Sequence, residues 1–136
     1  MAVKIAITNQ KGGVGKTTTA VNLAASLSKT NRSVLLIDVD PQANATSAAG
    51  LSGSDCLSLF EFFESNKKIE NFIIDAQGGN KIIPGNQNLV ATEKQIERSQ
   101  HREKFFSNNL KVIEKNYDYI FFDCPPSLNL LTINAM

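Results

Sequence analysis

The fold of this chain is decided by one stretch, Lys11-Gly12-Gly13-Val14-Gly15-Lys16-Thr17-Thr18. An apolar run rich in β-branched residues, 3–8, precedes it, and a helix-like run, 19–29, follows it. Glycines let a backbone approach an anion closely, and the first turn of a helix offers unpaired N–H groups and the positive end of its dipole. The pattern therefore predicts a phosphate-binding loop between a first strand and a first helix.

The loop departs from the general pattern G-x-x-x-x-G-K-[ST] at one position, where Gln10 replaces the first glycine. In that pattern Lys16 reaches the β- and γ-phosphates and the Thr17 hydroxyl can ligate Mg²⁺. A second lysine, Lys11, stands at the front of the loop. This arrangement resembles the deviant Walker A loop of the ParA/MinD group of P-loop ATPases. The alternative, a glycine-rich turn with incidental lysines, would rarely place these residues at this spacing.

The composition describes one ordinary globular unit. The chain has 136 residues, 42% hydrophobic and 20% charged, with a formal net charge of +1. Such a charge gives no overall attraction to nucleic acid or to an anionic membrane. The short apolar start contains Lys4, unlike a signal peptide, and no apolar run is long enough to span a bilayer. Cys56 and Cys124 lack metal-site spacing and are too few for an iron–sulfur cluster within one chain, so we expect reduced, buried thiols.

A second apolar run, residues 34–37, delivers two acids, Asp38 and Asp40. Its unbroken apolar character predicts a strand buried on both faces of a parallel sheet, in a right-handed βαβ unit. Acids at the carboxyl end of such a strand face the ligand crevice, and alternation along the strand predicts that both lie on the same side. A turn with a helix-capping aspartate before Pro41 is the structural alternative.

Two acidic segments extend the resemblance. Residues 38–44 resemble the D-x-D-P-Q-x-N switch segment of ParA and Soj proteins, by which Asp40 orients the attacking water and Asp38 supports the Mg²⁺ shell. Residues 117–123 predict a second strongly buried strand that ends in an acid and resembles a Walker B strand. The D-C-P-P-S segment that starts at Asp123 matches the ParA group, which implies that Asp123 holds Mg²⁺, usually through a water.

The first half of the chain predicts one covering helix and several shorter elements. Four residues share one helical face at 3–4 spacing and predict a core stripe: Ala20, Leu23, Ala24 and Leu27. The small polar residues 45–53 predict a mobile connection, and residues 57–63 predict a short helix whose Phe60 and Phe63 belong to the core. Residues 69–74 fit helix and strand equally.

The second half predicts a turn, a strand and helices. Residues 77–80 form the turn, and residues 81–83 form a short strand stopped by Pro84 and Gly85, similar to the L-I-P-A/G strand end of the ParA group. Residues 88–116 are helical with mixed charges, which indicates a solvated face; a surface for a partner or DNA is the second interpretation. We expect the single histidine, His101, on the surface. Residues 128–136 predict the start of another helix.

Together these patterns predict one α/β domain. The resemblance implies a P-loop NTPase fold with a mostly parallel sheet and helices on both faces. Complete members of the group are longer, so residues 1–136 are expected to be the N-terminal portion of a single P-loop ATPase domain, AAA-31/CbiA-like, with its C-terminal strands missing. A sheet cut short in this way is expected to have an unpaired edge.

The resemblance also implies an activity, a weak Mg²⁺-dependent ATPase acting in chromosome or plasmid partitioning. The implied cofactors are ATP and Mg²⁺. The implied nucleotide-binding residues are Lys11, Gly12, Gly13, Val14, Gly15, Lys16, Thr17 and Thr18. The implied catalytic residues are Lys11, Lys16 and Asp40. The implied metal-site residues are Thr17, Asp38 and Asp123.

The implied partners follow from the same family. They are a second copy of the chain in an ATP-bound homodimer, in which Lys11 reaches the partner's phosphates, a ParB-like centromere-binding protein, and non-specific DNA bound through the missing C-terminal part. A cytoplasmic, nucleoid-associated protein without a membrane partner is expected. Three alternatives remain open: a MinD-like membrane-linked ATPase, a non-hydrolysing nucleotide-binding scaffold, and a small-molecule kinase or ligase, which would need an acceptor pocket.

Overall fold

A five-stranded sheet forms the centre of the computed structural model, which describes residues 2–7, 14–52, 57–65, 67–76, 79–98 and 100–125. For residues 14–18, 93, 96, 97 and 100–103 it describes the backbone alone. The strands lie in the order β1 (Val3–Ile7), β5 (Tyr119–Asp123), β2 (Val34–Asp38), β4 (Lys81–Ile83) and β3 (Ile74–Asp75). The first four are parallel, and β3 pairs antiparallel with β4. The predicted α/β class with a mostly parallel sheet is confirmed.

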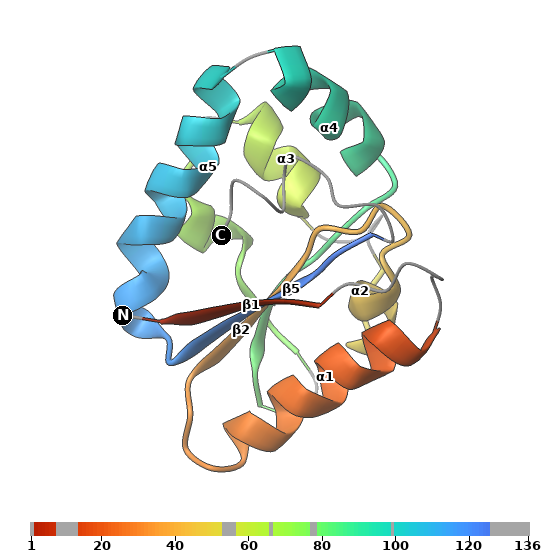
Figure 1. The fold of residues 1–136 in the computed structure, drawn as a ribbon, viewed down its shortest axis with the longest axis vertical. Helices are drawn as coiled ribbons and strands as arrows, with labels where there is room; N and C mark the ends of the chain where they lie inside the picture. The colour runs from red at the N-terminus through yellow and green to blue at the C-terminus, as the bar shows by residue number, and fades with distance from the viewer. Residues whose placement is uncertain are drawn as a thin grey trace.

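Helices cover both faces of this sheet (Figure 1). On one face lie α1 (Val14–Ser28) and α2 (Asn44–Ala48). On the other lie α3 (Leu59–Glu64), α4 (Leu89–Arg98) and α5 (Gln100–Ile113). All of β2 is buried, as its unbroken apolar sequence predicts for a strand between two helical layers.

The two faces are packed with different side chains. We call the α1–α2 side the alanine face; its buried residues are Ala20, Ala24, Val34, Leu36, Ala45, Ala49, Ile82 and Phe121. We call the α3–α5 side the aromatic face; its buried phenylalanines are Phe62, Phe63, Phe72, Phe106 and Phe122. On the aromatic face, Phe62 stacks on Phe105 with 4.8 Å between ring centroids. Side-chain alternation along β2 and β5 divides the apolar residues between these faces.

The shorter elements resolve several expectations. Residues 69–74, which fit two patterns, contain both a 3₁₀ turn, η1 (Ile69–Phe72), and the start of β3. The helical region 88–116 holds α4, α5 and a 3₁₀ turn, η2 (Glu114–Asn116). The helix expected within residues 57–63 is α3, with Phe63 buried and Phe60 half-buried against the core.

Two expectations about the alanine face were wrong. The supposed connection 45–53 begins with α2, whose Ala45 and Thr46 are fully buried. Leu23 was assigned to the core stripe of α1 but is 41% exposed, whereas Ala20 and Ala24 are buried. The reason is helical geometry, because successive residues are about 100° apart around the helix axis. When Ala20 and Ala24 contact the sheet, Leu23 lies at the side of that contact.

Other expectations concern residues that are only partly described. Cys124 is buried, and its thiol donates to the Phe122 carbonyl at 3.4 Å, whereas Cys56 lies outside the described residues. The helix expected over 128–136, residues 77 and 78 of the turn, and the side chain of His101 also lie outside them. Within the described residues, no helix combines the length and apolar character needed to cross a membrane.

Candidate functional site

The candidate site lies where three parallel strands end and α1 begins. Ile7 at the end of β1 is in register with Asp123 at the end of β5, and Asp123 is in register with Asp38 at the end of β2. From β1 the chain crosses to α1, which runs back antiparallel to the strand (Figure 1). The N-terminus of α1 therefore lies at the carboxyl edge of the sheet, where ligands of open α/β sheets bind.

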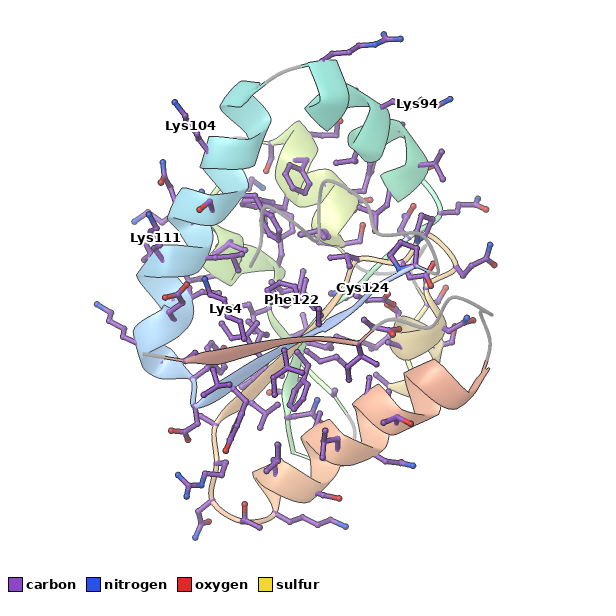
Figure 2. The ribbon with its side chains drawn as sticks, viewed as in Figure 1. Lys4, Lys94, Lys104, Lys111, Phe122 and Cys124 are labelled. Carbon is purple, nitrogen blue, oxygen red and sulfur yellow. The ribbon has the colours of Figure 1, made fainter. Side chains whose placement is uncertain are left out.

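Asp38 and Asp123 lie on the alanine face of this edge. Alternation places Asp38 on the side of Leu36, and Asp123 on the side of Phe121. The neighbours of Asp123, Phe122 and Cys124, belong to the aromatic face (Figure 2). Because registered residues of parallel strands point to the same face, the two carboxylates are neighbours, and both are fully buried.

The environment of Asp38 disfavours its charge. Burial raises the pKa of Asp38 from 3.8 to about 7; the nearby Asp123 charge also raises it, and hydrogen bonds from Thr46 and Asp40 act in the opposite direction. Two neighbouring buried carboxylates repel each other when both are ionised. A cation bound between them would relieve this repulsion, so the pair is suited to hold one.

Hydrogen bonds from α2 and from the turn before it fix the Asp38 carboxylate. The backbone N–H of Thr46 donates to Asp38 Oδ2 at 2.9 Å, and the Thr46 hydroxyl donates to the same oxygen at 2.6 Å. The N–H of Asp40 donates to Asp38 Oδ1 at 3.2 Å. The N–H of Gly85, beyond the end of β4, donates to Thr46 Oγ1 at 2.7 Å.

Asp40 lies in a turn beyond the end of β2. Its side chain accepts from the Gln42 N–H at 3.0 Å, and its carbonyl accepts from the Ala43 N–H at 2.9 Å. Ala43 then takes a left-handed conformation, with φ of 55°, before α2 begins. Because β2 ends at Asp38, the strand alternation from which we placed Asp40 beside Asp38 does not extend to Asp40. The turn of the structural alternative is present, and Asp40 is 3% exposed within it. The helix-capping aspartate of that alternative is not, because the N-cap of α2 is Ala43 and no side chain caps it.

Comparison with known proteins identifies the family. The AAA_31 family, described as an AAA domain, matches residues 2–136. The chain belongs to this AAA-domain family. The resemblance to the ParA/Soj group is also confirmed by individual relatives.

Two curated relatives of this AAA-domain chain carry the names Soj and ParA, and the second is a chromosome partitioning protein by name. The sporulation initiation inhibitor protein Soj of Bacillus subtilis is 44% identical over 134 residues, which cover 97% of this chain and 53% of that protein. The chromosome partitioning protein ParA of Myxococcus xanthus is 40% identical over 134 residues, which cover 97% of this chain and 47% of that protein. The chain thus spans about half the length of these relatives.

Solved structures share the fold. Cobyrinic acid a,c-diamide synthase from Mycobacterium smegmatis, with bound ADP and magnesium, has a TM-score of 0.89 and 32% identity, covering 99% of this chain and 56% of that one. A plasmid partition protein from Borrelia burgdorferi has a TM-score of 0.82 and 32% identity, covering 99% and 61%. These neighbours confirm the P-loop ATPase fold class of this AAA-domain chain.

The structure describes only part of the predicted site of this AAA-domain chain. Lys11, Gly12 and Gly13 lie outside the described residues. The first residues of α1 have a described helical backbone but no described side chains: Val14, Gly15, Lys16, Thr17 and Thr18. Asp38 and Asp123 are brought together, and Asp40 is linked to Asp38 through its backbone. The roles of all these residues remain predictions.

The donor set fits Mg²⁺. Among the described residues, no three His, Cys, Asp or Glu side chains form a group that could hold a metal. Mg²⁺ does not need such a group, because it usually keeps several waters and binds one or two carboxylates together with substrate phosphates. The adjacent Asp38 and Asp123, at the carboxyl ends of β2 and β5 near the start of α1, match the carboxylate part of that requirement.

Sequence reasoning missed two residues and a cavity. Thr46 was placed in a mobile connection, and Gly85 was interpreted only as a strand stop, yet both belong to the Asp38 network. A cavity of about 600 Å³ also lies beside the turn after β2. Its lining residues are Pro41, Gln42, Ala43, Glu61, Asn86, Gln87, Asn88 and Val90. A run of three amides directly after Gly85 was the sequence signal that could have indicated a polar pocket.

Proposed function

We propose that this chain is the nucleotide-binding part of a ParA-like ATPase that acts in chromosome or plasmid partitioning. The observation that carries the proposal is the buried pair of Asp38 and Asp123 at the carboxyl edge of the sheet, next to the start of α1. The name of the Myxococcus xanthus relative, chromosome partitioning protein ParA, supports the process. The whole protein is proposed to be cytoplasmic and to associate with the nucleoid.

The proposed roles divide between the loop and the acids. Residues 11–18 surround the phosphates, with Lys16 neutralising charge on the γ-phosphate. Bound Mg²⁺ supplies Lewis-acid stabilisation of the phosphate oxygens. Thr17 and Asp123 hold the metal shell, and Asp38 supports it. Asp40 holds the attacking water in line, a positioning role that phosphoryl transfer requires because little other protein chemistry is involved.

Dimerisation is proposed to control the rate. Lys11 of one subunit reaches the phosphates of the other, and a cation supplied in trans can contribute roughly 10³–10⁵ in rate. Hydrolysis by a monomer is therefore slow. A ParB-like protein and non-specific DNA are the proposed partners of the full-length dimer, and DNA binding of this kind weakens steeply as salt rises.

The test combines binding and turnover in the full-length protein. Isothermal titration with Mg·ATP should show binding, and phosphate release per molecule should rise with protein concentration. Lys11→Ala should bind nucleotide but lose the concentration dependence. Binding without phosphate release at any concentration would instead indicate the non-hydrolysing scaffold. Turnover that depends on anionic vesicles rather than on DNA would favour the MinD-like alternative.

A ligase is the second candidate function. Two observations favour it: the structural neighbour named cobyrinic acid a,c-diamide synthase, and the cavity of about 600 Å³ that could hold an acceptor. In this case ATP would activate a carboxylic acid for amide formation. Incubation with ATP, glutamine and cobyrinic acid, followed by mass spectrometry, tests it. An amidated product formed together with ADP would displace the partitioning proposal.

A further inference from the structure

The geometry points to Thr46 as the positioning residue of the metal site: its hydroxyl, held by the Gly85 N–H, fixes the Asp38 carboxylate so that Oδ1 is the oxygen presented to the Mg²⁺ shell. This inference rests on the proposed function, because it assigns a role within the same site. It goes further by adding α2 and the end of β4 to the residues that determine metal affinity.

The direction of each hydrogen bond around Thr46 is determined by chemistry. A backbone N–H can only donate, so Thr46 Oγ1 accepts from Gly85 at 2.7 Å. The hydroxyl then directs its proton to Asp38 Oδ2 at 2.6 Å, and the Thr46 N–H donates to the same oxygen at 2.9 Å. Thr46 is fully buried, so water does not compete for these bonds. The hydroxyl is therefore a relay between two main-chain segments and the carboxylate.

The two oxygens of Asp38 are left in different states. Oδ2 accepts two short hydrogen bonds from Thr46, which use both of its lone pairs. Among the described residues, Oδ1 accepts one longer bond, 3.2 Å, from the Asp40 N–H. Oδ1 therefore keeps acceptor capacity for a metal-bound water.

Gly85 lies so close to Asp38 that no side chain would fit between them. A Cβ at position 85 would lie 2.8 Å from the Asp38 carbonyl oxygen and 2.9 Å from its Cγ. The absence of a side chain at 85 lets the backbone N–H come close enough to bond Thr46. Gly85 thus acts on the carboxylate through the Thr46 hydroxyl.

The test replaces the hydroxyl and measures metal affinity. In the full-length protein with a non-hydrolysable ATP analogue, Mn²⁺ binding is followed by electron paramagnetic resonance. We expect Thr46→Val to weaken Mn²⁺ binding about tenfold or more, since hydrogen bonds to charged groups are among the stronger ones. Thr46→Ser, which keeps the hydroxyl, should restore binding to within about threefold. Affinity for the analogue in EDTA should be equal in all variants.

A matched control is available in α4. Thr92 is fully buried, and among the described residues its hydroxyl has no hydrogen-bond partner, so Thr92→Val makes the same chemical change away from Asp38. It should leave Mn²⁺ affinity unchanged. Wild-type affinity in Thr46→Val, or equal loss in Thr46→Ser and Thr46→Val, would overturn the inference while leaving the proposed function in place. A wild-type protein that binds no metal–nucleotide would overturn both.

The metal-free protein gives a second readout that does not require a loaded site. The ¹³C resonance of the Asp38 carboxyl group should shift in Thr46→Val and return in Thr46→Ser, while Thr92→Val leaves it in place. An unchanged resonance in Thr46→Val would contradict the contact itself and overturn the inference.

Discussion

The two faces of the sheet use opposite means of packing. The aromatic face is filled by large rings, with Phe62, Phe72 and Phe106 among its fully buried side chains. The alanine face is closed by small residues of α1 and α2, and it also holds the buried Asp38, Thr46 and Asp123. Small side chains bring helix backbones close to the strand ends, which is what a site built from main-chain N–H groups requires. The comparison suggests that one face mainly supplies stability and the other mainly supplies chemistry.

The largest effect that would sharpen this comparison is expected on the aromatic face. Phe62 contacts the rings of Phe63, Phe72 and Phe105 with centroid distances of 5.2, 5.7 and 4.8 Å. Phe62→Ala should lower the free energy of unfolding by about 3–5 kcal/mol, from lost burial and a cavity. Urea unfolding measures the change, and the half-buried Phe60→Ala serves as control. If folded Phe62→Ala lost as much free energy of nucleotide binding as of unfolding, the aromatic face would not be limited to stability.

The next effect is a pH dependence of the alanine face. The pKa of Asp38 is about 7 in the folded chain against 3.8 otherwise, so the folded state binds more protons between these values. This group therefore does not lower the free energy of unfolding below about pH 4. Between about pH 4 and pH 7 the free energy of unfolding falls by roughly 4 kcal/mol, and above about pH 7 it falls no further on account of this group. In EDTA, Asp38→Asn should be more stable than the wild type at pH 8 and lose that advantage at pH 4.

The control for the pH series is Asp75→Asn, because the Asp75 side chain is 82% exposed. This substitution removes only a solvent-exposed ion pair with Lys81, so it should change the free energy of unfolding only slightly at each pH of the series. If the difference in free energy of unfolding between Asp38→Asn and wild type did not change with pH, the buried carboxyl pair would be contradicted. Addition of Mg²⁺ with nucleotide should reverse the trend by favouring the ionised form.

A smaller effect is expected from enlarging the alanine face. Ala24 is fully buried in α1, where the helix lies against the sheet. Ala24→Leu should cost about 1–3 kcal/mol by overpacking and should also displace the start of α1, weakening nucleotide binding. Ala91→Leu, at an exposed position of α4, is the matched control. Urea unfolding measures the loss of stability, and calorimetric titration measures the loss of nucleotide affinity. A destabilised Ala24→Leu that bound nucleotide with full affinity would contradict the link between the packing of α1 and nucleotide binding.

The smallest effect is expected from an ion pair at the other end of β1. Lys4 pairs with Glu114, and their side chains are 22% and 12% exposed (Figure 2 labels Lys4). Lys4→Met should change the free energy of unfolding by about 1 kcal/mol or less, and less still in high salt. A double-mutant cycle with Glu114→Gln measures the coupling. A coupling above that range would show that the partial burial of Lys4 and Glu114 strengthens the pair.

The sequence predicted the strands and their acids because those signals are local. Residues 34–37 and 119–122 are apolar without interruption, and an acid follows each run directly. α2 was missed because it is short, and its first turn is held by the contact of Thr46 with Asp38 and Gly85 rather than by helix propensity. Leu23 was misplaced because a periodic apolar stripe does not reveal which of its residues contact the sheet most closely. The phosphate loop stays a prediction, since its side chains lie outside the described residues.

The strand order has a consequence for how the chain is made. β5 lies between β1 and β2, so Val3 and Val34 both pair with Tyr119 and not with each other. During synthesis the first two strands leave the ribosome long before the strand that joins them. Sequence-distant pairing of this kind is slow and leaves apolar edges open to aggregation. The nascent chain is therefore expected to need chaperone protection until β5 has emerged.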